Sequence, residues 1–128
     1  MKYKNILLIE APGVKLKTNG LNIGAVRRRH PKISQLTLAA IVQREFPTSK
    51  VEIQDLKLKI KEKQVNSLTY GNKQIEIYQI GRDFSEIDSN IRHAELILLT
   101  ANFTQEAGII GDLIEFCKTT NPKAKILK

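Results

Sequence analysis

Two short runs of consecutive apolar residues constrain this fold most: Ile6–Ile9 near one end of the chain and Leu96–Leu99 near the other. Polar residues bound each run. An uninterrupted apolar run of this length is typical of a parallel strand that is buried on both faces. Such strands are stable only when helices cover the sheet above and below. The chain is therefore expected to build an α/β sheet with these two runs at its centre.

The rest of the chain alternates in the way that such a sheet requires. A helical period runs from Lys32 to Phe46, and Lys50–Leu56 then alternates with the period of a strand near the sheet edge. A second helix is expected from about Thr104 to Thr119, and Ala124–Leu127 begins another strand. This order predicts a three-layer, doubly wound α/β fold, Rossmann-like or flavodoxin-like, with a mainly parallel sheet.

The middle of the chain departs from this alternation. Val65–Tyr70 and Gln74–Ile80 flank Gly71-Asn72, a strong signal for a β-hairpin. We interpret residues of about 63–80 as a hairpin insertion. Because 128 residues suit one core rather than two, residues 1–128 are expected to form a single domain.

The net charge of +8 raises the question of an anionic partner. Basic residues cluster at Arg27–Arg29 and Lys57–Lys63, but no aromatic side chain lies among them to stack on bases. We therefore interpret both clusters as solvated faces, and nucleic acid is not an expected partner; an anionic partner or a neighbouring domain is the alternative. No apolar run approaches the ~20 residues that span a bilayer, and the start of the chain lacks the apolar core of a signal peptide. The expected location is the cytoplasm, away from membranes.

Few residues offer catalytic or metal chemistry. Cys117, the only cysteine, lies on the apolar side of the second predicted helix and is expected to be a small buried hydrophobe. His93 is expected to lie at the surface. His30 follows the first strand and is a weak candidate for an axial ligand to a cofactor metal. No hydrolytic triad can be recognised.

The carboxyl ends of the central strands are the expected place for a ligand. They carry two loops, Ala11–Pro31, expected to lack regular structure, and Thr100–Gln105. Neither fits a phosphoacceptor domain, a flavodoxin phosphate loop, a dinucleotide fingerprint or a P-loop. The second loop offers hydroxyls, amides, a small Ala101 and a helix N-terminus, which suits a large, flat cofactor with an amide rim. The alternative is an ordinary turn capped by Thr104.

Four segments give a family resemblance by their order and spacing. They are Asn5-Ile6-Leu7-Leu8-Ile9-Glu10-Ala11-Pro12, His30-Pro31-Lys32-Ile33-Ser34-Gln35-Leu36-Thr37-Leu38-Ala39-Ala40, Val51-Glu52-Ile53-Gln54-Asp55 and Leu98-Leu99-Thr100-Ala101-Asn102-Phe103-Thr104-Gln105-Glu106-Ala107. In this order the chain resembles the N-terminal cobalamin (vitamin B12)-binding domain of radical S-adenosylmethionine proteins. Two features of that family differ here: Ser34-Gln35 stand where Leu-Gly is usual, and the Asp-x-His-x-x-Gly motif of methionine-synthase-like proteins is absent.

The resemblance implies a corrin cofactor, methylcobalamin in the first instance, presented to a radical S-adenosylmethionine domain downstream in the same polypeptide. That domain would hold the S-adenosylmethionine and the 4Fe-4S cluster, so no catalysis is expected from this chain alone. The resemblance also implies that Arg27–Arg29 face that domain or the cofactor phosphate. The alternative is a cofactor-free interaction or regulatory module with the same fold. The implied cofactor-binding residues are Ala11, Pro12, Gly13, Thr100, Ala101, Asn102, Phe103, Thr104 and Gln105.

Overall fold

The computed structural model describes residues 3–18, 21–23, 33–58, 61–100 and 107–127. Its strands are β1 (Asn5–Glu10), β2 (Gly13–Thr18), β3 (Leu21–Ile23), β4 (Lys50–Asp55), β5 (Glu62–Tyr70), β6 (Lys73–Ile80), β7 (Leu96–Thr100) and β8 (Lys125–Leu127). Its helices are α1 (Ile33–Glu45), the 3-10 helix η1 (Phe84–Ile87), α2 (Asp88–His93) and α3 (Ala107–Thr120). None of the described helices is both long enough and apolar enough to cross a membrane.

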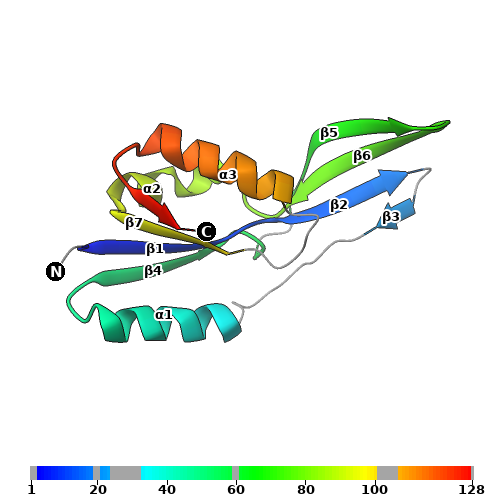
Figure 1. The fold of residues 1–128 in the computed structure, drawn as a ribbon. Coiled ribbons are helices and arrows are strands. Elements are labelled where there is room, and N and C mark those ends of the chain that lie inside the picture. Colours follow the sequence, from blue (N-terminus) through cyan, green and yellow to red (C-terminus); the bar gives the residue numbers. More distant parts are fainter. Residues whose placement is uncertain (1–2, 19–20, 24–32, 59–60, 101–106, 128) are drawn as a thin grey trace.

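Four strands form a parallel sheet in the order β4-β1-β7-β8. The chain goes from β1 outward to β4, returns to β7 on the other side of β1, and then continues to β8. Figure 1 shows α1 on one face of this sheet, and α2 and α3 on the other. We call the parallel sheet with its helices the body. The predicted α/β class and parallel sheet are confirmed in this form.

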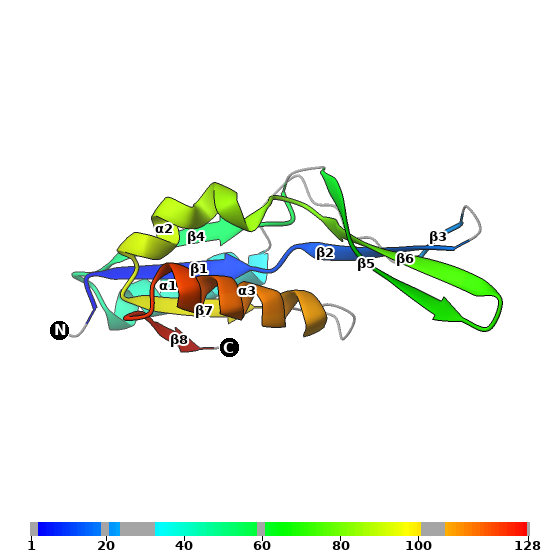
Figure 2. The ribbon, with the colours of Figure 1, turned by 90° about the horizontal axis from the view of Figure 1, so that it is seen from above.

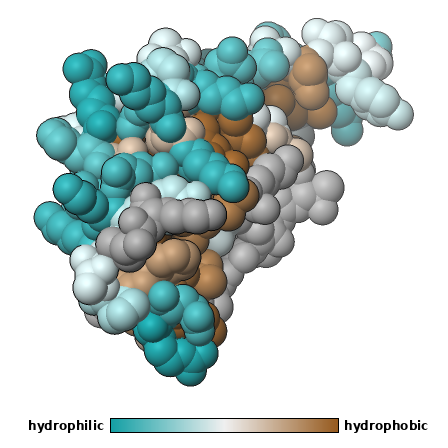
Figure 3. All heavy atoms as spheres, turned by 60° about the vertical axis from the view of Figure 1, so that its left-hand side comes forward, coloured by the Kyte–Doolittle hydropathy of each residue, from teal (hydrophilic) through white to brown (hydrophobic). Residues whose placement is uncertain are grey.

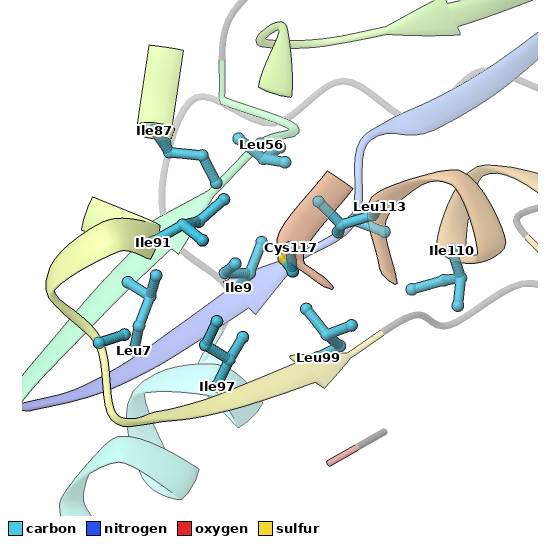
Figure 4. Packing of buried hydrophobic residues seen from close by; sticks show 12 residues of the cluster. Leu7, Ile9, Leu56, Ile87, Ile91, Ile97, Leu99, Ile110, Leu113 and Cys117 are labelled. Atoms are coloured by element: carbon cyan, nitrogen blue, oxygen red, sulfur yellow. The ribbon is translucent and has the colours of Figure 1, made fainter. Parts of the chain in front are cut away.

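Two apolar layers hold the body together, one on each face of the sheet. On the α1 face, Ile6, Leu8 and Leu96 pack with Val42 of the helix. On the other face, Leu7, Ile9, Ile97 and Leu99 of the strands point toward α2 and α3 (Figure 4). Successive residues of a strand point to opposite faces, so the continuous apolar runs fill both layers. The helical residues of the second layer include Ile87, Ile91, Ile110, Leu113 and Cys117.

The other four strands form a separate antiparallel sheet, in the order β3-β2-β6-β5. We call these strands the arm, because they project beyond the body in Figures 1 and 2. The hairpin around Gly71 is confirmed, but it does not stand alone. β2 continues outward from β1 and pairs with β6, from Gly13 opposite Ile80 to Lys17 opposite Glu76.

This pairing corrects the prediction that Val14–Pro31 lacks regular structure. Gly13–Thr18 and Leu21–Ile23 are strands, and the remaining residues 19–20 and 24–31 lie outside the described part. The physical reason is in the sequence. Val14, Leu16 and Thr18 alternate with two lysines, which gives β2 one apolar and one charged face, and the hairpin supplies the strand with which to pair.

Candidate functional site

The carboxyl ends of three parallel strands meet in one row. Glu10 at the end of β1 lies opposite Asp55 of β4 on one side and Thr100 of β7 on the other. The strand order reverses here, because the chain reaches β4 and β7 on opposite sides of β1. In open α/β sheets, ligands bind outside the carboxyl ends of the strands at such a reversal. This edge is therefore the first place to look for a site.

A buried lysine, Lys57, completes this row. Its Nζ donates a hydrogen bond to the Ala11 carbonyl oxygen at 2.7 Å and lies 3.4 Å from Glu10 Oε1. The side chains of Lys57 and Glu10 are 0% and 1% exposed. Thr100 Oγ1 donates to the other carboxylate oxygen of Glu10, and the Lys57 backbone N–H donates to Asp55 Oδ1 at 3.0 Å. We call Glu10, Asp55, Lys57 and Thr100 the edge cluster.

The edge cluster joins segments that are distant in sequence. A buried ion pair repays its desolvation only when hydrogen bonds satisfy its remaining atoms, and here Thr100 and the Ala11 carbonyl supply them. The chemistry that this arrangement supports is positional: it holds the ends of β1, β4 and β7 in one register. The interpretation of Lys57–Lys63 as a solvated face is therefore wrong for Lys57, because its ammonium group is buried beside the Glu10 carboxylate.

The residues predicted to contact a cofactor have different positions along this edge. Ala11, Pro12 and Gly13 are buried. The Ala11 N–H donates to the Thr100 carbonyl oxygen at 3.0 Å, and Gly13 begins β2 opposite Ile80. Thr100 is half-buried, and its hydroxyl donates a hydrogen bond to the Glu10 carboxylate. Ala101, Asn102, Phe103, Thr104 and Gln105 lie outside the described residues, so their predicted roles stay predictions.

A groove of about 300 Å³ lies between the arm and the first turns of α3. We call it the arm groove. Its lining is Val14, Val65, Asn66 and Ile77 from the arm and Gly108, Ile109 and Asp112 from α3. The lining is mainly apolar, with one amide and one carboxylate. Figure 3 shows hydrophobic atoms reaching the surface close to where the arm leaves the body. The sequence alone does not predict this groove, because its wall β2 lies in the segment that is expected to lack regular structure.

A smaller hollow of about 200 Å³ lies beside the opposite ends of the strands, between β1, β4 and α2. Two hydrogen bonds join residues of its lining: Asn90 Nδ2 donates to Glu52 Oε1 at 2.6 Å, and His93 Nδ1 is 2.7 Å from the Ser89 carbonyl oxygen. His93 is exposed, as predicted. Because these are the amino ends of the strands, this hollow is the weaker candidate for a ligand site.

The described residues contain no group of three or more His, Cys, Asp or Glu side chains arranged to hold a metal ion. Cys117 is buried in the core, as predicted, and burial raises the pKa of its thiol to about 11. A thiol in this state is neutral at physiological pH and unreactive. His30, the candidate axial ligand, lies outside the described residues, as do Arg27–Arg29.

Comparisons with protein-family profiles, with curated proteins and with solved structures return no match to this chain. The resemblance to cobalamin-binding domains therefore rests on the sequence segments quoted above and stays a prediction.

Proposed function

We propose that this chain is a doubly wound, Rossmann-like domain of the cobalamin-binding type, which holds a corrin at the carboxyl edge of its parallel sheet. The observation that carries the proposal is the strand order β4-β1-β7-β8, which reverses at β1 and β7. β7 leads directly into residues 101–106 and the start of α3. The segment that carries the hydroxyl and amide groups of the predicted site therefore follows, along the chain, the strand at the reversal.

The described residues fit a corrin in part. The arm groove offers an apolar wall, with the Asn66 amide and the Asp112 carboxylate as partners for the amide rim of a macrocycle. Its volume of about 300 Å³ is at the lower limit of small-molecule sites, so it suits one edge of a corrin rather than the whole. Ala11–Gly13 are buried and contribute the floor of the site. Most of the contact is assigned to Thr100–Gln105.

In this proposal the corrin supplies a transferable methyl group, and the chain's own residues bind and orient it. The single cysteine cannot provide the three-cysteine motif of a radical S-adenosylmethionine cluster. The S-adenosylmethionine and the 4Fe-4S cluster are therefore assigned to a catalytic domain downstream in the same polypeptide, in the cytoplasm. The role of this domain is to present the cofactor.

Titration with hydroxocobalamin tests the proposal. We expect a saturable change in the visible spectrum at one equivalent, and co-elution of the corrin with the protein in gel filtration. A change to the spectrum of the base-off, water-ligated corrin would agree with the missing Asp-x-His-x-x-Gly motif. A spectrum that stays unchanged, together with separate elution of corrin and protein, would contradict corrin binding by this chain.

The second candidate is a cofactor-free interaction module of the same fold. The observation that favours it is the arm, in which every residue of β5 is exposed. In that case the same titration gives no binding, and the arm rather than the sheet edge carries the function.

A further inference from the structure

β5 is an unusually open edge strand. It pairs with β6 on one side and has no strand on its other side among the described residues. All nine of its residues are exposed, and it lies along the free side of the arm (Figure 2). In an antiparallel ladder every second residue directs its backbone N–H and C=O away from its partner strand. The outer side of β5 therefore presents backbone groups that can pair with another strand.

Edge strands in stable monomers are usually short or carry charges and proline, which prevent pairing. The other edge of the arm follows this rule, because β3 has only three residues. In β5 the charged residues, Glu62 and Lys63, come before an irregularity between Gln64 and Asn66. The regular segment Asn66–Tyr70 contains no charge, no proline and no glycine. It carries two exposed apolar side chains, Leu68 (53% exposed) and Tyr70 (79% exposed).

We propose that two copies of this chain associate by antiparallel pairing of their β5 strands, around a two-fold axis at Leu68. This proposal is independent of corrin binding. Leu68 lies opposite Ile75 of β6, and Asn66 lies opposite Ile77, so Asn66, Leu68 and Tyr70 share one face of the arm. Ser67 and Thr69 share the other face.

The register of the proposed β5–β5 pairing follows from which residues share a face of the arm. A perpendicular two-fold axis pairs only residues of the same face. With the axis at Leu68, Leu68 meets its own copy, Asn66 meets Tyr70, and Ser67 meets Thr69. With the axis at Ser67, the irregularity next to Val65 would lie opposite Thr69 and shorten the ladder. Leu68 is therefore the centre that keeps all five regular residues paired, with no charge opposite another charge.

Pairing would join two four-stranded arms into one eight-stranded sheet. Its apolar face would run without a break from Leu16 and Ile77 across Ile75 to Leu68 and into the second copy. A contact of five residues per strand is smaller than a standard interface of about 1,200–2,000 Å². We therefore expect a weak dimer, with a dissociation constant on the order of 0.1 mM.

Sedimentation equilibrium of the chain without cobalamin, from about 10 µM to about 1 mM, measures this association. We expect the mass to approach twice the monomer mass at the upper end. Leu68→Lys places like charges opposite each other at the axis and should weaken dimerisation about tenfold or more. Ile41→Lys, at an exposed apolar position of α1 (45% exposed), is the matched control and should dimerise as the original chain does.

Mixing Leu68→Lys with Leu68→Glu gives the sharpest result. Each variant alone should dimerise about tenfold more weakly than the original chain, and the mixture should associate more tightly than either variant alone, because opposite charges then meet at the axis. Thr69→Lys, at an exposed position that would meet Ser67 of the second copy, is the second variant and should also weaken the dimer. A monomer throughout the concentration range, an effect of Ile41→Lys equal to that of Leu68→Lys, failure of the mixture to associate more tightly than either variant, or growth beyond a dimer would overturn the proposal.

Discussion

The body and the arm use the same element, the β-strand, under opposite conditions. In β1 every residue after Asn5 is buried, whereas in β5 every residue is exposed. The parallel sheet has helices on both faces, which is the arrangement that parallel strands need. The arm has one apolar face and one polar face, on which Lys15 and Lys17 pair with Glu62 and Lys17 lies 4.4 Å from the centre of the Tyr78 ring.

The difference shows which part of the molecule carries stability and which is free to act at a surface. Burial of apolar area provides most of the free energy of folding, so the body should determine the global stability. The arm should open locally at a smaller cost, because it has few buried apolar contacts. Substitutions in the two regions should therefore differ strongly in effect.

The largest loss of stability is expected for a substitution at Gly81, which directly follows β6 of the arm and lies against Leu56 of the body. Gly81 has a φ of +130°, and a Cβ there would lie 2.0 Å from the Leu56 carbonyl oxygen. Gly81→Ala should lower the free energy of unfolding by about 5 kcal/mol, because it adds a backbone clash to an unfavourable φ. Chemical denaturation measures this.

Gly71→Ala is the matched control for Gly81→Ala. Gly71 also has a positive φ, +62°, but nothing lies within 4 Å of a Cβ there. It should cost only about 1 kcal/mol. Equal losses for the two variants would show that Gly81 does not act through contact with the body.

The second-largest loss of stability is expected in the edge cluster. Lys57→Met removes the ammonium beside the buried Glu10 carboxylate and should cost about 4 kcal/mol. The double variant Glu10→Gln/Lys57→Met should recover part of this loss, because no charge is then left without its counter-ion. A double-mutant cycle measures the coupling. Additive losses would contradict a direct interaction between the two side chains.

The core of the body gives the cleanest contrast with the arm. Leu113→Ala should cost about 3 kcal/mol, because Leu113 is completely buried between α3 and the sheet. Leu68→Ala, the same change at an exposed position of β5, should cost at most about 0.5 kcal/mol. Thermal or chemical unfolding measures both at a concentration where the protein is monomeric. Similar losses at the two positions would break the distinction between body and arm.

The smallest effect on stability is expected for a substitution on the polar face of the arm. Hydrogen bonds from Lys15, and then from Lys17, lower the pKa of Glu62 below its ordinary value of 4.5. A lowered carboxyl pKa contributes stability above pH 4.5, which is lost as the pH falls through the lowered pKa. Glu62→Gln should therefore speed amide exchange in the arm at neutral pH and have no effect in strong acid. An effect that persists in strong acid would exclude the ion pairs as its cause.

Local pattern predicted the elements of the body and the β5–β6 hairpin of the arm well, because the signal for each element lies within its own residues. The apolar runs of β1 and β7, the alternation of β4 and the turn at Gly71 all correspond to observed elements. Pairings between distant segments could not be predicted in the same way. The alternation from Val14 to Thr18 is compatible with a strand, but its partner β6 begins more than fifty residues later along the chain, and without that pairing the segment resembles a loop.

The same dependence on contacts between distant segments explains which parts of the candidate site could be predicted. General α/β topology predicted a site at the ends of the central strands, and the structure places Glu10 beside Asp55 and Thr100 there. The sequence did not reveal that Lys57 lies inside, because the Glu10 carboxylate that stabilises its charge is 47 positions away. It also missed the arm groove, since that groove exists only where β2, β5, β6 and α3 come together.

Corrin binding at the carboxyl edge, beside the arm groove, can be measured directly. Gly108 lines this groove, while Gly111 lies farther along α3, and a Cβ at either position would meet nothing within 4 Å. Because a Cβ has space at both positions, Gly108→Trp should place an indole at the groove, and Gly111→Trp, at an equally open position of the same helix, is its matched control. In a hydroxocobalamin titration, we expect at least about tenfold weaker binding for Gly108→Trp and unchanged binding for Gly111→Trp, if the corrin lies at this groove. Equal affinities for both variants and the original chain, or no binding by any of them, would contradict corrin binding at this groove.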